Sequence, residues 1–177
     1  MSLSVHDGRR WLHDTNRNVL KTKIRNMMQS NFSRSGGGRS GGYRKCWSEK
    51  TAHEEIQNAF GENFETRILS PNQHGYNDYV NRLKDYVEKH VKGITSSQLR
   101  NVYALIREKT NPDSLPHIRP RLAYVAGRAN NDELRTLIYL LDLLAVRVDD
   151  KAKLKNFKSF FESVIAYHKY FGGNDNA

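Results

Sequence analysis

The sequence has a single cysteine, Cys46, among 177 residues, and it has no long apolar run. One cysteine excludes an internal disulfide and a zinc site built from cysteines, and it is typical of a reducing compartment. The longest apolar stretch, residues 137–146, is about half the length of a membrane span and contains Asp142. The first residues alternate charged with apolar side chains and build no secretory apolar region. These absences predict a cytoplasmic protein without a membrane segment.

Acidic residues are also in deficit, with 19 Asp and Glu against 29 Lys and Arg and a formal net charge of +10. Residues 1–50 hold most of the surplus, because they carry 11 basic and 3 acidic residues. A surplus of this size predicts a polyanionic partner, since cations bound along a phosphate chain release its counterions. Nucleic acid is the first candidate.

Motifs of catalysis and of metal binding are missing as well. The sequence contains no HExxH, GxSxG, Walker loop or GxGxxG, and its 7 histidines have no carboxylates or cysteines at ligand spacing. His90 and His168 fall in apolar stripes, where a hydrogen-bonded core histidine is expected. We therefore predict no metal, no cofactor and no enzymatic activity.

Residues 1–49 form a basic N-terminal arm that contains one short helical pattern, over residues 16–29. Glycine, serine and arginine dominate residues 33–44, a composition that cannot bury enough surface to offset the entropy of ordering. We predict a flexible basic arm. Two interpretations stay open at this point, a plain tether and a nucleic-acid-touching arm.

From residue 50 onwards the apolar residues follow helical spacing, and no segment shows the alternation of a strand. Thr51 and Glu54 have the spacing of a capping box, and a loop is expected between Gly61 and Gly75. The most apolar helix, over residues 134–148, should form the centre of the fold. The prediction is an all-α protein, a compact bundle of about five to six helices over residues 50–173 with a tail over residues 174–177. The six expected helices cover residues 51–60, 76–91, 95–110, 120–128, 132–148 and 151–171.

The segment 118–128 carries the clearest candidate for nucleic-acid binding. On a helix, Arg121, Tyr124 and Arg128 share one face, while Leu122 and Val125 share another that can pack. Arginine donates two parallel hydrogen bonds to phosphate and can also lie against a base, as Tyr124 can. The alternative is a surface row of arginines paired with nearby carboxylates such as those of Asp132 and Glu133.

A second candidate is a row of lysines on the last helix, interrupted by Glu162. Taken alone, a lysine row at this spacing is more often the solvated face of an amphipathic helix. Arg100, with Arg107 two turns along the same helix, is a weaker case of the same kind. The lysines of the row are Lys151, Lys155, Lys158 and Lys169.

Three ordered motifs in the C-terminal half resemble the small, Csm-series subunit of type III-A CRISPR effector complexes. They are ITSSQLR at residues 94–100, RPRLAYVAGR at residues 119–128 and FFESVIAYHKYFGG at residues 160–173. The resemblance covers residues 76–173. It implies a non-catalytic helical bundle that stacks in several copies beside the backbone subunits holding the guide RNA, along the path of guide RNA and target RNA. It also implies contact with the nucleic-acid backbone through Arg100, Arg119, Arg121, Arg128 and Lys169, without reading sequence.

Two other functions remain open from the sequence. One is a free-standing helical RNA-binding regulator or chaperone that binds through its Arg/Gly-rich arm and dimerises through the helix over residues 134–148. The other is a structural assembly protein in which Tyr76, Tyr79, Tyr86 and Tyr103 lie at an interface rather than in the core.

Overall fold

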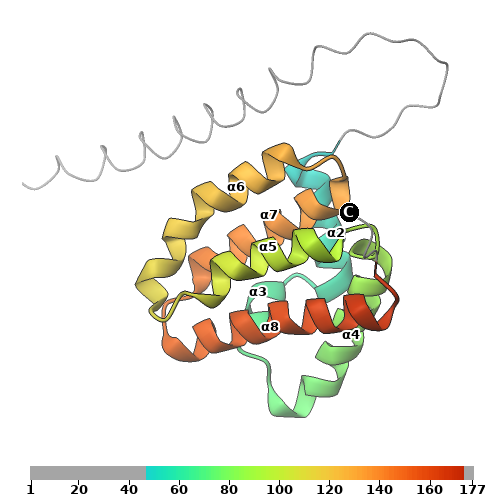
Figure 1. Cartoon of the computed structure of the whole chain (residues 1–177). Coiled ribbons are helices and arrows are strands. Elements are labelled where there is room, and N and C mark those ends of the chain that lie inside the picture. The colour runs from blue at the N-terminus through green and yellow to red at the C-terminus, as the bar shows by residue number, and fades with distance from the viewer. Residues whose placement is uncertain (1–46, 174–177) are drawn as a thin grey trace, which may run out of the picture. The chain divides into compact units, whose positions relative to one another are not determined.

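The computed structural model describes residues 47–173, except for the side chain of Gln73. The chain divides into two units, Met1–Arg44 and Lys45–Ala177, and the described residues lie in the second. They form helices only, which confirms the all-α prediction (Figure 1). Residues 1–46 of the predicted arm, which include its short helix, and the tail after residue 173 lie outside the described residues. The α-helices are α2 (Glu49–Phe60), α3 (Phe64–Leu69), α4 (Tyr76–His90), α5 (Ser96–Arg107), α6 (Arg119–Arg128), α7 (Asp132–Arg147) and α8 (Lys151–Tyr170), and the 3-10 helices are η1 (Gln73–Gly75) and η2 (Pro112–Ile118).

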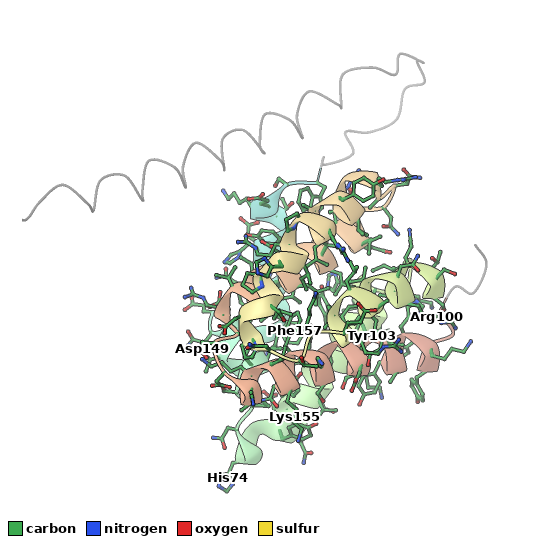
Figure 2. All side chains as sticks on the ribbon, turned by 60° about the vertical axis from the view of Figure 1, so that its left-hand side comes forward. His74, Arg100, Tyr103, Asp149, Lys155 and Phe157 are labelled. Carbon is green, nitrogen blue, oxygen red and sulfur yellow. The ribbon has the colours of Figure 1, made fainter. Side chains whose placement is uncertain are left out.

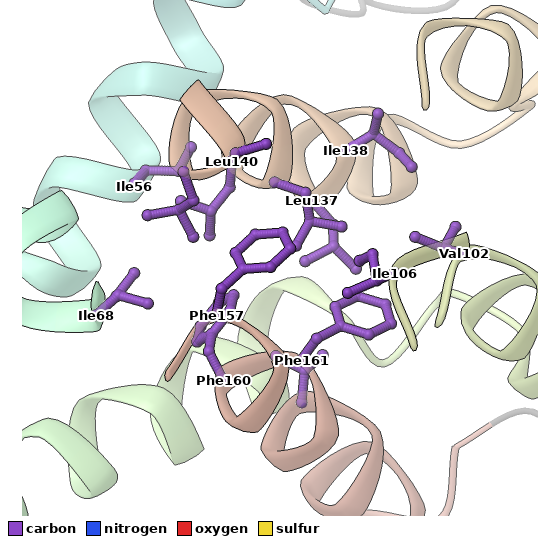
Figure 3. Packing of buried hydrophobic residues seen from close by; sticks show 14 of the residues in the cluster. Ile56, Ile68, Val102, Ile106, Leu137, Ile138, Leu140, Phe157, Phe160 and Phe161 are labelled. Atoms are coloured by element: carbon purple, nitrogen blue, oxygen red, sulfur yellow. The ribbon is translucent and has the colours of Figure 1, made fainter. Parts of the chain in front are cut away.

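Helices α7 and α8 organise the core, because between them they contact every other α-helix among the described residues. Leu137 and Leu140 of α7 are fully buried, as are Phe157 and Phe161 of α8. In Figure 3, Phe157 points toward the two leucines and Phe161 points toward Ile106 of α5. Each such side chain contributes about 1.5–3 kcal/mol when it leaves water, so this layer supplies much of the stability. The prediction of a central apolar helix is confirmed.

The first helix begins earlier than its predicted capping box. The Ser48 hydroxyl accepts from the Thr51 amide (3.1 Å), and the Thr51 hydroxyl accepts from the Ser48 amide (3.2 Å). Ser48 is therefore the N-cap, and the predicted Thr51–Glu54 box is wrong because Thr51 already lies inside the helix. The Trp47 indole donates to the Thr136 hydroxyl of α7 (3.1 Å) and fixes the start of this unit.

Helix α3 occupies a segment that was predicted as loop. Its six residues bury Phe64, Ile68 and Leu69, and its N-cap residue Asn63 makes no side-chain cap. So short a helix is marginal by itself and is stabilised by packing, here against α7 and α8. Asn156 of α8 donates to the Leu69 carbonyl (2.8 Å) at its end. Contacts with residues distant in sequence therefore make this segment helical.

Local signals mark the starts of three later helices. Thr95 and Gln98 form a capping box of α5, Pro120 lies in the first turn of α6, and Asn131 caps α7. The buried His168 ring shares a hydrogen bond of 2.7 Å with the Ile94 carbonyl, as predicted for a core histidine. His90 is only half-buried and stacks on Tyr86.

The expected interface of four tyrosines is wrong for two of them, whereas Tyr76 is 48% exposed and Tyr103 is half-buried. Tyr79 and Tyr86 are 7% and 1% exposed, so they belong to the core and not to an interface. Helix α7 packs against α2, α3 and α6 and buries eight of its residues within the chain. Most of the apolar surface of α7 is therefore covered within the chain, and Val146 is the apolar residue of this helix that stays exposed.

Candidate nucleic-acid interface

Helix α6 is the most weakly buried long helix of the described unit. Leu122 is its one buried residue, while Val125 and Ala126 are half-buried against the core. The opposite face carries Arg121, Tyr124 and Arg128, which we call the α6 row, and all three are exposed. This division follows from helical spacing, because residues three and seven positions apart return to the same face. Tyr124 is 64% exposed, which is unusual for so large a ring.

Within the α6 row, Tyr124 and Arg128 are joined. The Arg128 guanidinium donates to the Tyr124 hydroxyl (2.8 Å) and lies 5.6 Å from the centre of its ring. Neither Arg121 nor Arg128 forms an ion pair with a carboxylate among residues 47–173. The row thus presents two cations and an aromatic face to solvent.

The carboxylates expected to neutralise this row are engaged elsewhere. Asp132 pairs with Arg135 of its own helix (3.0 Å). Glu133 lies so close to Gly93 that a Cβ atom there would collide with its carboxylate. The alternative of an arginine row paired with Asp132 and Glu133 therefore does not apply to the α6 row.

Arg119 behaves differently from the α6 row. Its Nε and Nη2 donate to the two oxygens of Asp142 on α7, at 2.7 and 2.8 Å. The hydrogen bond to this carboxylate raises the pKa of the guanidinium. Of the arginines predicted to touch phosphate, Arg119 is thus already bound by a carboxylate of the chain.

The lysine row on α8 does not act as one group. Lys151, Lys155 and Lys169 are exposed, whereas Lys158 donates to the Arg107 carbonyl at the end of α5 (3.0 Å). That bond satisfies a carbonyl that the helix leaves open, so Lys158 caps α5. Figure 2 shows Arg100 and Lys155 apart from each other on the surface, so these two predicted cations do not share one patch.

Arg100 and Arg107 were predicted as a weak candidate, but the tyrosine between them was missed. Residues 100–107 of α5 repeat the spacing of the α6 row, with Arg100, Tyr103 and Arg107 at the same intervals. A search for internal repeats would have found this signal. The two rows differ in detail, because Tyr103 stacks on Phe161 and donates to Glu162 (2.6 Å). That bond raises the pKa of the Tyr103 hydroxyl.

The described surface offers little for other chemistry. Among residues 47–173 no group of three His, Cys, Asp or Glu could hold a metal ion. A hollow of about 560 Å³ beside α3 is lined by the ion pairs of Arg147 with Glu65 (2.9 Å) and of Lys153 with Asp149 (2.7 Å). No helix in this part of the chain has the length and apolar character needed to cross a membrane.

Comparison with known proteins gives one match. A family model described as Csm2 Type III-A matches residues 54–174, which is more than half of the chain. The matched range contains the α6 row, the α5 repeat and the whole of α8. No curated protein matches the chain, and no solved structure matches it.

Proposed function

The chain belongs to the Csm2 type III-A family, the small subunits of type III-A CRISPR complexes, and from this we propose that it is a non-catalytic subunit that contacts RNA through helix α6. In this proposal it stacks in several copies along guide RNA and target RNA, beside the backbone subunits. The observation that carries the proposal is the α6 row, whose two arginines and exposed tyrosine have no carboxylate partner in the described unit.

Physical chemistry favours a phosphate chain as the partner of this row. Arginine forks match phosphate oxygens, and each neutralised phosphate releases counterions. Contacts of this kind fix position without reading bases, which suits a subunit that must accept any guide. Arg100, Lys151, Lys155 and Lys169 are exposed and remain proposed secondary contacts, whereas the bonds of Arg119 and Lys158 argue for structural roles.

The regulator or chaperone hypothesis receives less support. A dimer through residues 134–148 would find little apolar surface on α7, because eight residues of that helix are buried within the chain. Its second element, binding through the Arg/Gly-rich arm, concerns residues outside the described range. The two hypotheses therefore differ in whether the RNA contact lies on α6 or on residues 1–46.

Charge reversal on the α6 row tests the proposal. Arg121→Glu combined with Arg128→Glu should weaken binding of single-stranded RNA about tenfold or more near 0.1 M salt, because two phosphate contacts are lost. The melting temperature should stay close to that of the parent, since both side chains are exposed. Affinity is measured by fluorescence anisotropy over a salt series.

The control carries the same change of charge at another place. Lys50→Glu combined with Lys89→Glu alters two exposed lysines on α2 and α4. This variant should lose much less affinity than the α6 variant. Equal losses for both pairs would mean that net charge alone drives binding, and the proposed interface would be rejected.

A further inference from the structure

Helix α6 buries one side chain fully and two more partly. Leu122 is the single buried side chain within it, and Ala129 is buried just after its end. It packs chiefly on α7 (Figure 1). A helix of ten residues is marginal by itself, so its contacts with α7, apolar and polar, fix its direction.

Two polar contacts to α7 hold the two ends of α6. At the start, Arg119 and Asp142 form the two-bond fork described above. At the end, Arg135 of α7 donates to the Ala129 carbonyl (2.7 Å). The α6 row lies between these two contacts.

Arg119 and the α6 row point in different directions. Arg119 and Arg121 are two residues apart, and at about 100° per residue they lie on nearly opposite sides of the helix. Arg119 shares the side of Leu122, which faces α7, and its bonds to Asp142 agree with that placement. Arg121 and Arg128 lie on the exposed side.

We propose that Asp142 is a positioning residue, which fixes helix α6 on α7 through Arg119 so that Arg121, Tyr124 and Arg128 are presented as a rigid row. This inference rests on the proposed RNA contact of that row. In this proposal Arg119 holds α6 in place and does not contact phosphate. A fixed row loses less conformational entropy on binding than a mobile one, and therefore binds more tightly.

The direction in which Asp142→Asn changes RNA affinity separates a positioning role from a simple effect of charge. Asp142→Asn removes a negative charge beside the interface, so a charge effect alone predicts tighter RNA binding. Release of Arg119 as a new phosphate contact would also steepen the slope of log affinity against log salt by about 0.7. A positioning role predicts the opposite, about threefold to tenfold weaker binding with an unchanged slope.

Hydrogen exchange gives a measurement that does not depend on RNA. In the full chain, Asp142→Asn and Arg119→Ala should each speed amide exchange in residues 119–128 and leave α5 unchanged. The matched control is Asp78→Asn, which removes an equal charge from an exposed carboxylate bonded to Arg67 and Arg82 on another part of the surface. It should change neither α6 exchange nor RNA affinity.

The exchanged pair, Arg119→Asp with Asp142→Arg, completes the test. It should restore slow exchange and RNA affinity, because the ion pair is rebuilt in reverse, whereas a phosphate contact by Arg119 would stay lost. Tighter binding by Asp142→Asn, or unaltered α6 exchange, would overturn the inference. The inference would also be overturned if Asp142→Asn speeds exchange in α6 but leaves RNA affinity unaltered. This outcome counts only if charge reversal of Arg121 and Arg128 does weaken binding. If that reversal has no effect, the proposed function itself fails, and the exchange data still decide whether Asp142 fixes α6.

Discussion

Two tyrosines of this chain have opposite surroundings. Tyr86 is 1% exposed, and its hydroxyl has no hydrogen-bond partner within residues 47–173. Burial raises the pKa of this hydroxyl well above its usual value. Tyr124 is 64% exposed and accepts a hydrogen bond from Arg128. The first tyrosine therefore serves packing, and the second is available for contact with a partner.

The unpartnered hydroxyl of Tyr86 leads to a prediction on stability. Tyr86→Phe should raise the free energy of unfolding by about 1 kcal/mol, because a buried polar group without a partner is costly. The melting temperature should rise by about 2–4 °C. Tyr103→Phe is the control, since its hydroxyl is bonded to Glu162 and its removal should give no gain. A loss of stability in Tyr86→Phe would show that the hydroxyl is satisfied.

At the residue scale, helical spacing predicted the exposed face of the α6 row but not the state of Arg119. Residues three or four apart on one helix can be paired from sequence alone. Asp142 lies 23 positions from Arg119, on another helix. The bond between Lys158 and the Arg107 carbonyl spans 51 positions. Which cations the chain uses for its own structure therefore depends on tertiary packing.

At the scale of elements, the helices with strong periodicity were predictable and the short one was not. Apolar residues at spacings of three and four predicted α4, α5, α7 and α8 nearly to their ends, because each has a broad buried stripe or a cap. Helix α3 has six residues, fewer than two turns, and no capping side chain. Its Phe64, Ile68 and Leu69 become helical because the core receives them. The local sequence gives only a weak signal for this helix, the four-residue spacing of Phe64 and Ile68.

Helix α6 also contains a glycine, Gly127, at a position where no neighbouring atom of residues 47–173 excludes a side chain. A Cβ atom at Gly127 would meet nothing within 4 Å among the described residues. Gly127→Ala should raise the free energy of unfolding by about 0.5–1 kcal/mol, since glycine is a poor helix former. Thermal or urea denaturation measures the change.

The matched control for Gly127 is Gly61, which ends α2 with a φ of 88°. Alanine there should destabilise the chain, because a Cβ atom strains the backbone at positive φ. A destabilising Gly127→Ala would contradict the view that this face of α6 has no contact within the chain.

At the scale of the whole molecule, positive charge comes from two parts of the chain, the N-terminal residues and the residues that match the family model. Residues 1–50 hold most of the surplus, whereas the family match begins at residue 54. The matched unit has a modest net charge, so its basic surface depends on where individual arginines point. The all-α bundle could therefore be predicted from periodicity. The proposed interface could not, because it depends on which cations are already bonded within the chain.

The central claim is that RNA touches helix α6 in the assembled type III-A complex. Ultraviolet cross-linking of the complex, followed by trypsin and mass spectrometry, tests it directly, because cleavage after Arg121 and Arg128 releases residues 122–128 with Tyr124 as their one tyrosine. An RNA adduct on this peptide is the expected result. RNA adducts confined to peptides from residues 1–46, with none on residues 122–128, would contradict it.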